Sequence, residues 1–231
     1  MSIIPDSPHT SGTDGFGNAT IEGTVHDGHS SFSVSVQGTV EVPSAEPEGP
    51  VPESPALDDD GMVFKYQTQR TEPGPALLGF LASAPDCDCD DLSRAVGLMH
   101  RLHSKFVYEK GVTGPETTAE DAMALGRGVC QDYAQILISL LRSRGIPCRY
   151  VVGFTVGEGE SHAWVEVLHE GTWYGLDPTG DTFVGPRHIK VSHGRDYDDC
   201  RINRGVFFGA HPVSQRVHAN VFPVNDQEVS S

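Results

Sequence analysis

A cysteine stands where a glycine-broken loop runs into an apolar helical pattern, in residues 126–134 (GRGVCQDYA). After Cys130, apolar residues recur with helical spacing, and Gly145 and Pro147 then end the pattern. The glycines let the chain turn sharply, so the helix begins at about Cys130. Any fold of this chain must therefore carry that thiol at the amino end of a largely apolar helix.

The helix is followed by segments in which apolar and polar residues alternate, as they do in strands. We expect strands at about 148–155, 161–168, 172–177, 204–209 and 215–223. Before the helix, apolar residues at three-and-four spacing predict another helix from near Asp90 to about residue 107. Thr117 and Thr118 provide an N-cap for a short helix between the two.

The first sixty residues have a different character from the rest. Residues 31–42 (SFSVSVQGTVEV) alternate apolar and polar, which predicts a half-buried strand, and residues 19–25 are expected to pair with it across a turn at 26–28. Residues 43–60 are acidic and proline-rich, as in an extended linker. The expected organisation is an N-terminal β segment at 1–42, a linker at 43–60 and one core at 61–231.

Charge and composition limit the classes of molecule that this chain can be expected to bind. The net charge of −16 over 231 residues disfavours nucleic acid and anionic membranes, and is compatible with peptide or small amide substrates. No apolar run approaches the roughly 20 residues that span a bilayer, and the first residues do not resemble a signal peptide. Five cysteines without secretory features do not indicate a disulfide framework, so a cytoplasmic location is expected. The oligomeric state is left open.

Two later motifs supply partners for the thiol. An imidazole, His162, lies in residues 161–164 (SHAW), and a carboxylate, Asp177, lies in residues 176–179 (LDPT). A thiol, an imidazole and a carboxylate are the three parts of an activated cysteine nucleophile. A helix amino terminus and a neighbouring imidazolium both favour the thiolate, and the backbone N–H of Cys130 is a natural oxyanion donor. A second oxyanion donor is not identifiable.

Strand geometry places the imidazole and the carboxylate together. A hairpin centred between His169 and Glu170 puts His162 directly opposite Asp177. A register shifted by one paired step leaves them diagonal on the same face, and a slip by one residue moves them to opposite faces.

The alternation of each strand also sorts the remaining side chains. Trp164 and Trp173 fall on the face of His162, where we expect them to line a cleft as substrate-binding residues. Ala163, Val165 and Val167 point the other way, towards the core.

The motifs and their order resemble the transglutaminase-like superfamily, a papain-like group that includes bacterial proteins described as candidate cysteine proteases. The matching segments are 128–154, 161–167 and 173–181, with weaker matches at 188–199, at 204–209 and at 14–18 (DGFGN). The resemblance implies an α+β fold in which the helix bearing the nucleophile packs on an antiparallel sheet. Unlike bacterial members of the family, which have a longer β region before the DGFGN motif, this chain starts almost at it.

The resemblance also implies a reaction. Cys130 would attack a peptide or carboxamide carbonyl, His162 would protonate the departing amine, and Asp177 would orient His162. Hydrolysis, as by a cysteine protease or amidase, is favoured. Protein-glutamine transglutaminase activity and a non-catalytic binding or assembly module are the alternatives. No metal or organic cofactor is implied.

Other residues have competing interpretations. Cys148 and Cys200 are expected to be structural, because free cysteines are often buried as small hydrophobic residues. Cys87 and Cys89 lie near two histidines but lack the usual zinc spacing, so a solvated acidic loop is preferred to a metal site. Residues 194–197 (GRDY) contain either a local ion pair or a substrate contact.

Overall fold

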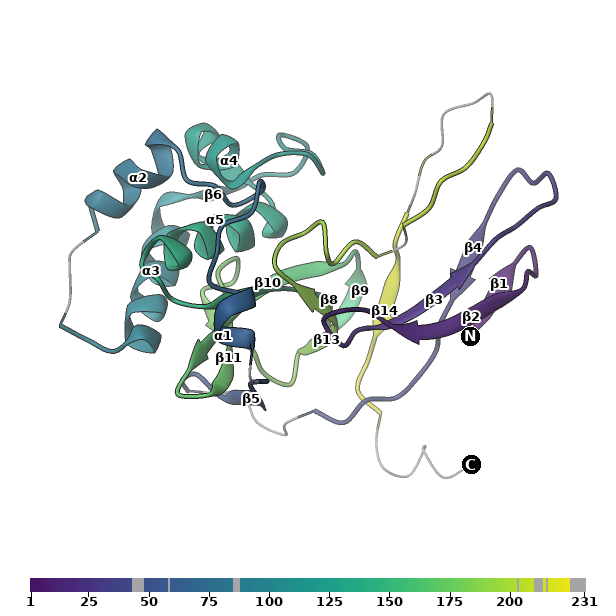
Figure 1. The fold of residues 1–231 in the computed structure, drawn as a ribbon, viewed down its shortest axis with the longest axis horizontal. Helices are drawn as coiled ribbons and strands as arrows, with labels where there is room; N and C mark the ends of the chain where they lie inside the picture. Colours follow the sequence, from purple (N-terminus) through teal and green to yellow (C-terminus); the bar gives the residue numbers. More distant parts are fainter. Residues whose placement is uncertain are drawn as a thin grey trace. The chain divides into compact units, whose positions relative to one another are not determined.

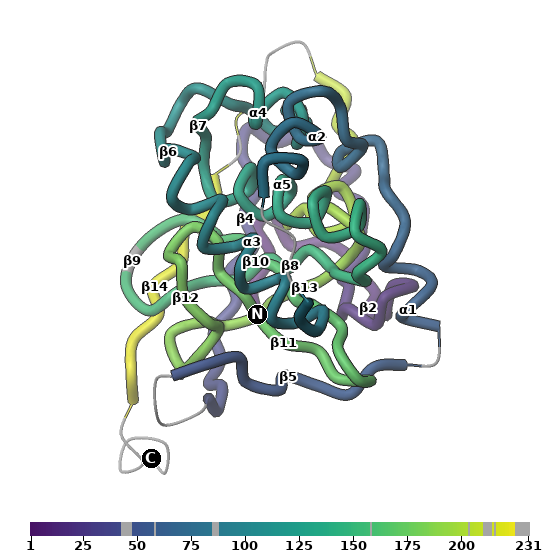
Figure 2. The backbone as a smooth tube through the Cα atoms, turned by 90° about the vertical axis from the view of Figure 1, so that its left-hand side faces the viewer, coloured from purple at the N-terminus to yellow at the C-terminus, as the bar shows by residue number. Residues whose placement is uncertain are grey.

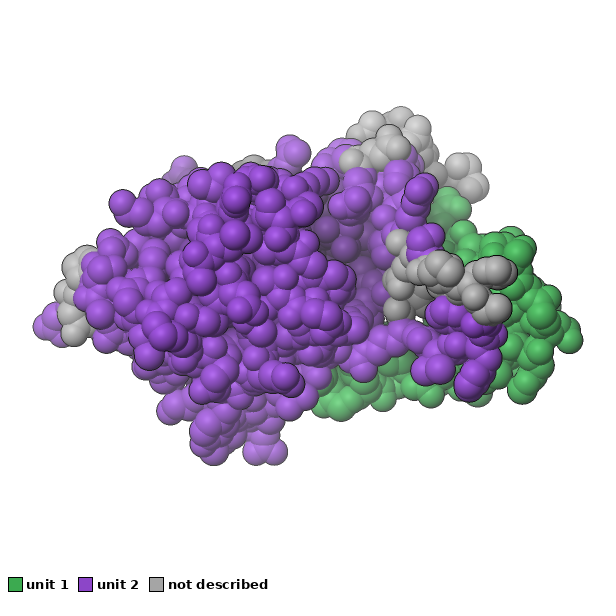
Figure 3. Space-filling model, turned by 90° about the horizontal axis from the view of Figure 1, so that it is seen from above, with its two compact units in different colours: residues 1–42 green, residues 43–231 purple. Residues whose placement is uncertain are grey.

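The structure is a computed structural model that describes residues 1–42, 48–57, 59–84, 88–202, 204–209, 214 and 216–224. The chain separates into two compact units, residues 1–42 and residues 43–231, which are coloured separately in Figure 3. In the second unit, helices and an antiparallel sheet form the α+β arrangement expected from the sequence. Among the described residues, none of the helices has the length and apolar character needed to cross a membrane.

The second unit is organised around one antiparallel sheet. Its strands, in spatial order, are β12 (Thr182–Phe183), β11 (Thr172–Asp177), β10 (His162–His169), β8 (Cys148–Thr155) and β13 (His188–Gly194). A further strand, β5 (Pro52–Pro55), pairs with the first half of β11. Two smaller ladders join β9 (Gly157–Gly159) to β14 (Ala219–Val221) and β6 (Val107–Tyr108) to β7 (Arg127–Gly128).

The main helices gather on one face of the sheet, as Figures 1 and 2 show. They are α2 (Pro75–Ala82), α3 (Asp91–Lys105), α4 (Ala119–Leu125) and the central α5 (Cys130–Ser143), while the single-turn α1 (Asp60–Val63) follows β5. Every residue from Asp132 to Arg142 in α5 is buried, because α5 packs on β10 and β8 while α2, α3 and α4 pack around it. Ala163, Val165 and Val167 of β10 are buried in this core, as the alternation predicted.

Local sequence explains where these helices begin. Thr118 caps α4, accepting a hydrogen bond from the backbone N–H of Asp121, whose carboxylate in turn accepts from Thr118. The amino end of α2 is satisfied differently. There the Glu120 carboxylate accepts from the N–H groups of Gly74, Ala76 and Leu77, which ties α4 to α2.

The hairpin between β10 and β11 has the alternative register. Val165 pairs with Leu176 and His169 with Thr172, so the turn is formed by Glu170 and Gly171. Both turn residues have positive φ, 47° and 75°, the conformation of a tight two-residue hairpin turn that favours glycine. The expectation of a turn centred between His169 and Glu170 was therefore wrong by one paired step.

The N-terminal unit differs from the expected hairpin. β3 (Ala19–Gly23) pairs with β2 (His9–Thr13), and the short β4 (Ser33–Ser35) pairs with β1 (Ser2–Ile4). The apolar side chains of residues 31–42 are exposed, including Val36 at 75%. The alternation there predicted a strand with a buried face, but no opposing layer covers that face within this small unit.

The expected linker and C-terminal strands also need correction. Part of the 43–60 segment is ordered as strand β5 and helix α1, because an edge strand tolerates proline where it needs no ladder donor. Residues 204–209 form no strand, and among the described residues 216–223 the one strand is β14. β13, which the strand assignment omitted, occupies one edge of the sheet.

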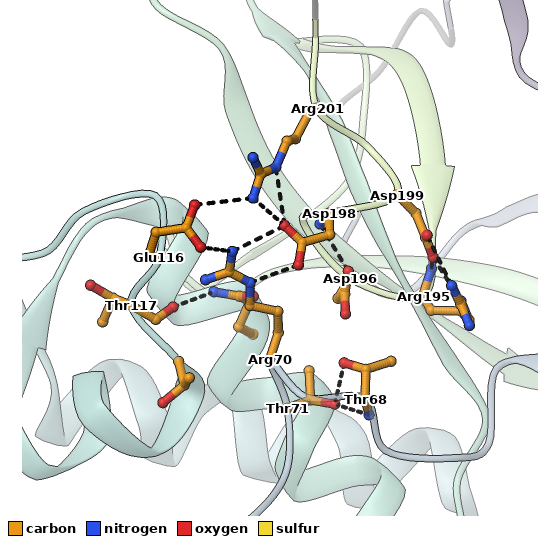
Figure 4. Close-up of polar contacts among 12 residues, drawn as sticks. Thr68, Arg70, Thr71, Glu116, Thr117, Arg195, Asp196, Asp198, Asp199 and Arg201 are labelled. Atoms are coloured by element: carbon orange, nitrogen blue, oxygen red, sulfur yellow. Dashed lines mark hydrogen bonds and ion pairs between the residues drawn. The ribbon is translucent and has the colours of Figure 1, made fainter. Parts of the chain in front are cut away.

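An ion-pair network fastens three loops around the helices (Figure 4). The buried Arg70 guanidinium lies between Glu116 at 2.6 Å and Asp198 at 2.8 Å, and Arg201 contacts both carboxylates. Next to it, Arg195 pairs with Asp199 at 2.8 Å. Arg195 of the GRDY segment thus forms a local ion pair, one of its two sequence interpretations, with an aspartate two residues beyond the segment.

Candidate active site

Cys130 is the first residue of α5 and is partly buried. The preceding loop is locked in place by Asp132, whose Oδ2 accepts from the Val129 N–H at 2.7 Å and from the Thr113 hydroxyl at 2.6 Å. Gly128 permits this contact, because a Cβ there would collide with the Asp132 carboxylate. Desolvation raises the pKa of that buried carboxyl group. The loop therefore fixes where the thiol lies.

His162 and Asp177 lie diagonally on one face of the sheet and are hydrogen-bonded. His162 Nε2 is 2.7 Å from Asp177 Oδ2, while Asp177 Oδ1 accepts from the backbone N–H groups of Thr179 at 2.9 Å and Gly180 at 3.3 Å. Burial opposes ionisation of Asp177, but its hydrogen bonds with His162 and His188 outweigh burial and hold its pKa well below the usual range. Asp177 is therefore a carboxylate at neutral pH.

The imidazole is strongly biased towards its charged form. Burial disfavours the imidazolium, yet the hydrogen bond to Asp177 and the interaction with the Cys130 sulfur raise the pKa of His162 to about 10. Because Nε2 faces Asp177, Nδ1 is the nitrogen left for the thiol. The structure thus brings Cys130, His162 and Asp177 together, in an arrangement suited to an imidazolium paired with a thiolate.

A protein-family model matches the part of the chain that contains these residues. Residues 84–178 match the model of the transglutaminase-like superfamily, and the matched span includes all three side chains. These residues form a transglutaminase-like domain.

Similar proteins support the same assignment. A solved structure named as a candidate cysteine protease from Cytophaga hutchinsonii has a TM-score of 0.55 and 25% identity, over 62% of this chain and 50% of that chain. An uncharacterized protein of Mycobacterium leprae is 41% identical over 46% of this chain and 41% of its own length. A protein-glutamine gamma-glutamyltransferase of Pseudomonas aeruginosa is 31% identical over 38% of this chain and 15% of its own length. The chain thus matches less than half of either curated relative.

The two tryptophans of the transglutaminase-like domain do not line an open cleft. Trp164 and Trp173 are both 0% exposed. Trp164 packs with Val151 and Val184 beside the His162 ring. The guanidinium carbon of Arg149 lies 4.1 Å from the centre of the Trp173 ring. The indole N–H of Trp173 donates to the Asp60 carboxylate. Strand alternation placed both indoles on one face, but it gave no sign that Asp60 of α1, Arg149 and Val184 would pack against them there.

The structure adds two residues to the neighbourhood of the site. His188 lies 3.3 Å from Asp177 Oδ2, and Tyr108, 47% exposed, is opposite Gly128 in the β6–β7 ladder. Desolvation and the electrostatic interaction with Cys130 raise the pKa of Tyr108. Neither residue had a clear sequence signal. His188 lies in a short alternating segment with Lys190 and Ser192, which does not mark it as part of a site, and Tyr108 lies well before the cysteine motif.

The other cysteines lie apart from this chemistry. Burial raises the pKa of Cys148 to about 11, and the buried Cys200 sulfur donates to the Tyr150 carbonyl. Cys89 is disulfide-bonded, which removes it as a thiolate metal ligand, and Cys87 lies outside the described residues. In the described part of the chain, the histidine and carboxylate group that could hold a metal ion is His162, Asp177 and His188.

Proposed function

We propose that this transglutaminase-like protein transfers acyl groups from a peptide or carboxamide carbonyl through a thioester on Cys130. The observation that carries the proposal is the position of Cys130 at the start of α5, beside an imidazole that is itself hydrogen-bonded to a buried carboxylate. Three isolated residues of these types would each have structural explanations. Their convergence matches what a cysteine nucleophile requires.

The first half-reaction forms the thioester. The Cys130 thiolate attacks the carbonyl carbon, and the backbone N–H of Cys130 at the helix start stabilises the oxyanion. The His162 imidazolium gives its proton to the departing nitrogen as the carbon–nitrogen bond breaks. An amine or ammonia leaves, and the acyl group remains on sulfur.

The second half-reaction regenerates the thiol. Neutral His162 takes a proton from water, the hydroxide adds to the thioester, and an acid is released as the carbon–sulfur bond breaks. A primary amine in place of water would give a cross-linked amide. Asp177 serves both steps by holding the imidazole orientation and stabilising its positive charge.

We favour hydrolysis over amine transfer. The similar Cytophaga hutchinsonii structure is named as a candidate cysteine protease, whereas the Pseudomonas aeruginosa relative is named for glutamine transfer and matches a shorter part of this chain. The substrate we propose is a peptide or a carboxamide. The net charge disfavours nucleic acid and anionic membranes.

The decisive experiment traps the acyl group and its acceptor. The full chain is incubated with a mixture of glutamine-containing peptides in oxygen-18 water, with and without a fluorescent primary amine, and then quenched in acid. Mass spectrometry should find a thioester on Cys130 and heavy oxygen in a newly formed carboxyl group. Incorporation of the amine instead would establish the transglutaminase alternative.

A matched control separates the enzyme from the non-catalytic module. Cys130→Ala should form neither the adduct nor the product. The same products from that variant would refute the mechanism. If wild-type Cys130 also fails to react with an amide-directed thiol warhead, the binding or assembly module takes the place of the enzyme.

A further inference from the structure

His188 is placed to act on the carboxylate that holds His162. It is the first residue of β13, and its side chain is 8% exposed. Its Nε2 is 3.3 Å from Asp177 Oδ2, the same oxygen that His162 contacts. β13 and β11 are separated in the sheet by β8 and β10, so His188 reaches the carboxylate from a strand that does not border β11.

A backbone group selects the tautomer of His188. The N–H of Gly185 donates to His188 Nδ1 at 3.3 Å, so Nδ1 acts as an acceptor. In a neutral imidazole the other nitrogen then carries the proton. His188 Nε2 is therefore an N–H donor aimed at Asp177, and it stabilises the carboxylate without needing a positive charge.

This tautomer argues against a metal site at the same three residues. A histidine that binds a metal through Nε2 uses the lone pair of that nitrogen and usually donates its Nδ1–H to a carbonyl or carboxylate. At His188 a backbone N–H donates to Nδ1 instead, which places the proton on Nε2. The ring thus suits a hydrogen bond to Asp177.

We propose that His188 is a positioning residue for the thiol chemistry, acting through Asp177. Two backbone N–H groups hold Oδ1, and the two imidazoles converge on Oδ2. With its orientation fixed on both oxygens, Asp177 keeps His162 Nε2 engaged and Nδ1 facing the thiol. This inference rests on the proposed role of Cys130 and deepens it.

Two substitutions separate hydrogen bonding from packing. His188→Gln keeps an N–H for Asp177 and an oxygen for the Gly185 N–H, but it loses the ring. His188→Phe keeps a ring against Trp164, whose centre lies 5.4 Å away, but it loses both hydrogen bonds. A positioning role predicts that Gln preserves function better than Phe, and a packing role predicts the reverse. His193→Gln, on the same strand, is the control.

The measurement is the rate at which iodoacetamide alkylates Cys130, followed by peptide mapping from pH 4 to pH 9. It needs no substrate. We expect His188→Phe to slow alkylation at pH 6 roughly tenfold, because a hydrogen bond to a charged group is lost. The rise of the alkylation rate with pH on the acid side of the profile should move up by roughly one pH unit. His188→Gln and His193→Gln should stay within about threefold of wild type. In an Asp177→Asn background, His188→Phe should add little, since both substitutions act through one carboxylate.

The outcomes distinguish this inference from the proposed function. If His162→Ala leaves the alkylation of Cys130 unchanged, the cysteine–histidine pairing fails and the proposed function falls with it. Suppose instead that His162→Ala does slow alkylation. The role of His188 is then refuted if His188→Phe and His188→Gln give the same alkylation rate. It is also refuted if the slowing caused by His188→Phe is as large in the Asp177→Asn background as in wild type. A fall in the wild-type rate after EDTA treatment would also overturn it, in favour of a metal site. Far-UV circular dichroism checks that each variant is folded.

Discussion

Two buried carboxylates on one face of the sheet are satisfied in contrasting ways. Asp177 interacts with two histidines, His162 and His188. Glu166, four residues along β10 from His162, contacts Arg149 at 2.5 Å and Lys190 at 2.7 Å. β10 and β13 contribute to both groups, and the buried Trp164 stands between them in β10.

The difference lies in which protons can move. Arginine stays cationic near neutrality and, although burial lowers the pKa of Lys190, both side chains form ion pairs with Glu166, so this group holds β8, β10 and β13 together. Imidazoles exchange protons in the range where a thiol also does, and the Asp177 group adjoins Cys130. One face of one sheet thus carries two groups. Glu166, Arg149 and Lys190 form an ionic clamp, and the Asp177 group is suited to acid–base chemistry. Substitutions in the Asp177 group should mainly change the reactivity of Cys130, whereas substitutions in the ionic clamp should mainly change the stability of the fold.

The largest effect is expected at Cys130. Cys130→Ala should lower acyl transfer by at least roughly a thousandfold, since the nucleophile is lost. Thermal stability should change little, because the residue is only partly buried. Product formation and the melting temperature are measured on the same preparation. A fall in both would mean that the cysteine belongs to the structural core rather than to a reactive site.

Asp177→Asn should have the next largest effect. The rate should fall by roughly ten- to a thousandfold, because the amide neither stabilises the imidazolium nor fixes its tautomer. The pKa of His162 should fall from about 10 towards its ordinary value of 6.5, which NMR titration of the ring would detect. An unchanged pKa would remove Asp177 from its assigned role.

The same substitution gives a pH dependence with a definite sign. Because the folded-state pKa of His162 is raised, its stabilising contribution is complete below about pH 6.5 and is lost as the pH rises through about 10. The pKa of Asp177 is lowered, so its contribution is present above about pH 3.8 and is lost as the pH falls further. The stability difference between wild type and Asp177→Asn should therefore shrink between pH 6.5 and 10. A constant difference over that range would contradict the pairing.

At the ionic clamp, Glu166→Gln should reverse the pattern. It leaves Arg149, whose side chain is 5% exposed, without its carboxylate, at a cost of roughly 3 kcal/mol. The core should melt about 6 to 12 °C lower, while Cys130 alkylation below the transition stays near wild type. Both tryptophans lie in the sheet, so their fluorescence reports this unit. The exposed-turn variant Glu170→Gln is the control, and equal melting temperatures would refute the clamp.

The sequence predicted the parts of the site that depend on local rules. The glycine loop and the helical pattern placed Cys130 at the first position of α5, and strand alternation placed His162 and Asp177 on one face. The exact register was not predictable from alternation, because both registers preserve the face; the positive φ of Gly171 selects one. His188 was missed because its role depends on β13 lying two strands from β10.

The smallest effect should come from the hairpin that both groups share. Gly171 has a φ of 75°, where an alanine Cβ is strained, so Gly171→Ala should cost roughly 1 kcal/mol. The control is Gly97→Ala within α3, where a new Cβ meets open space and alanine should stabilise by roughly 0.5 to 1 kcal/mol. Urea unfolding followed by tryptophan fluorescence should therefore give opposite signs for two identical substitutions. β10 carries both His162 and Glu166, so the strained turn should lower the stability of the whole sheet. The alkylation rate of Cys130 in the folded protein should stay near wild type. Alkylation of Cys130 that slowed by more than about threefold in Gly171→Ala would show instead that the turn holds the register on which the His162–Asp177 contact depends.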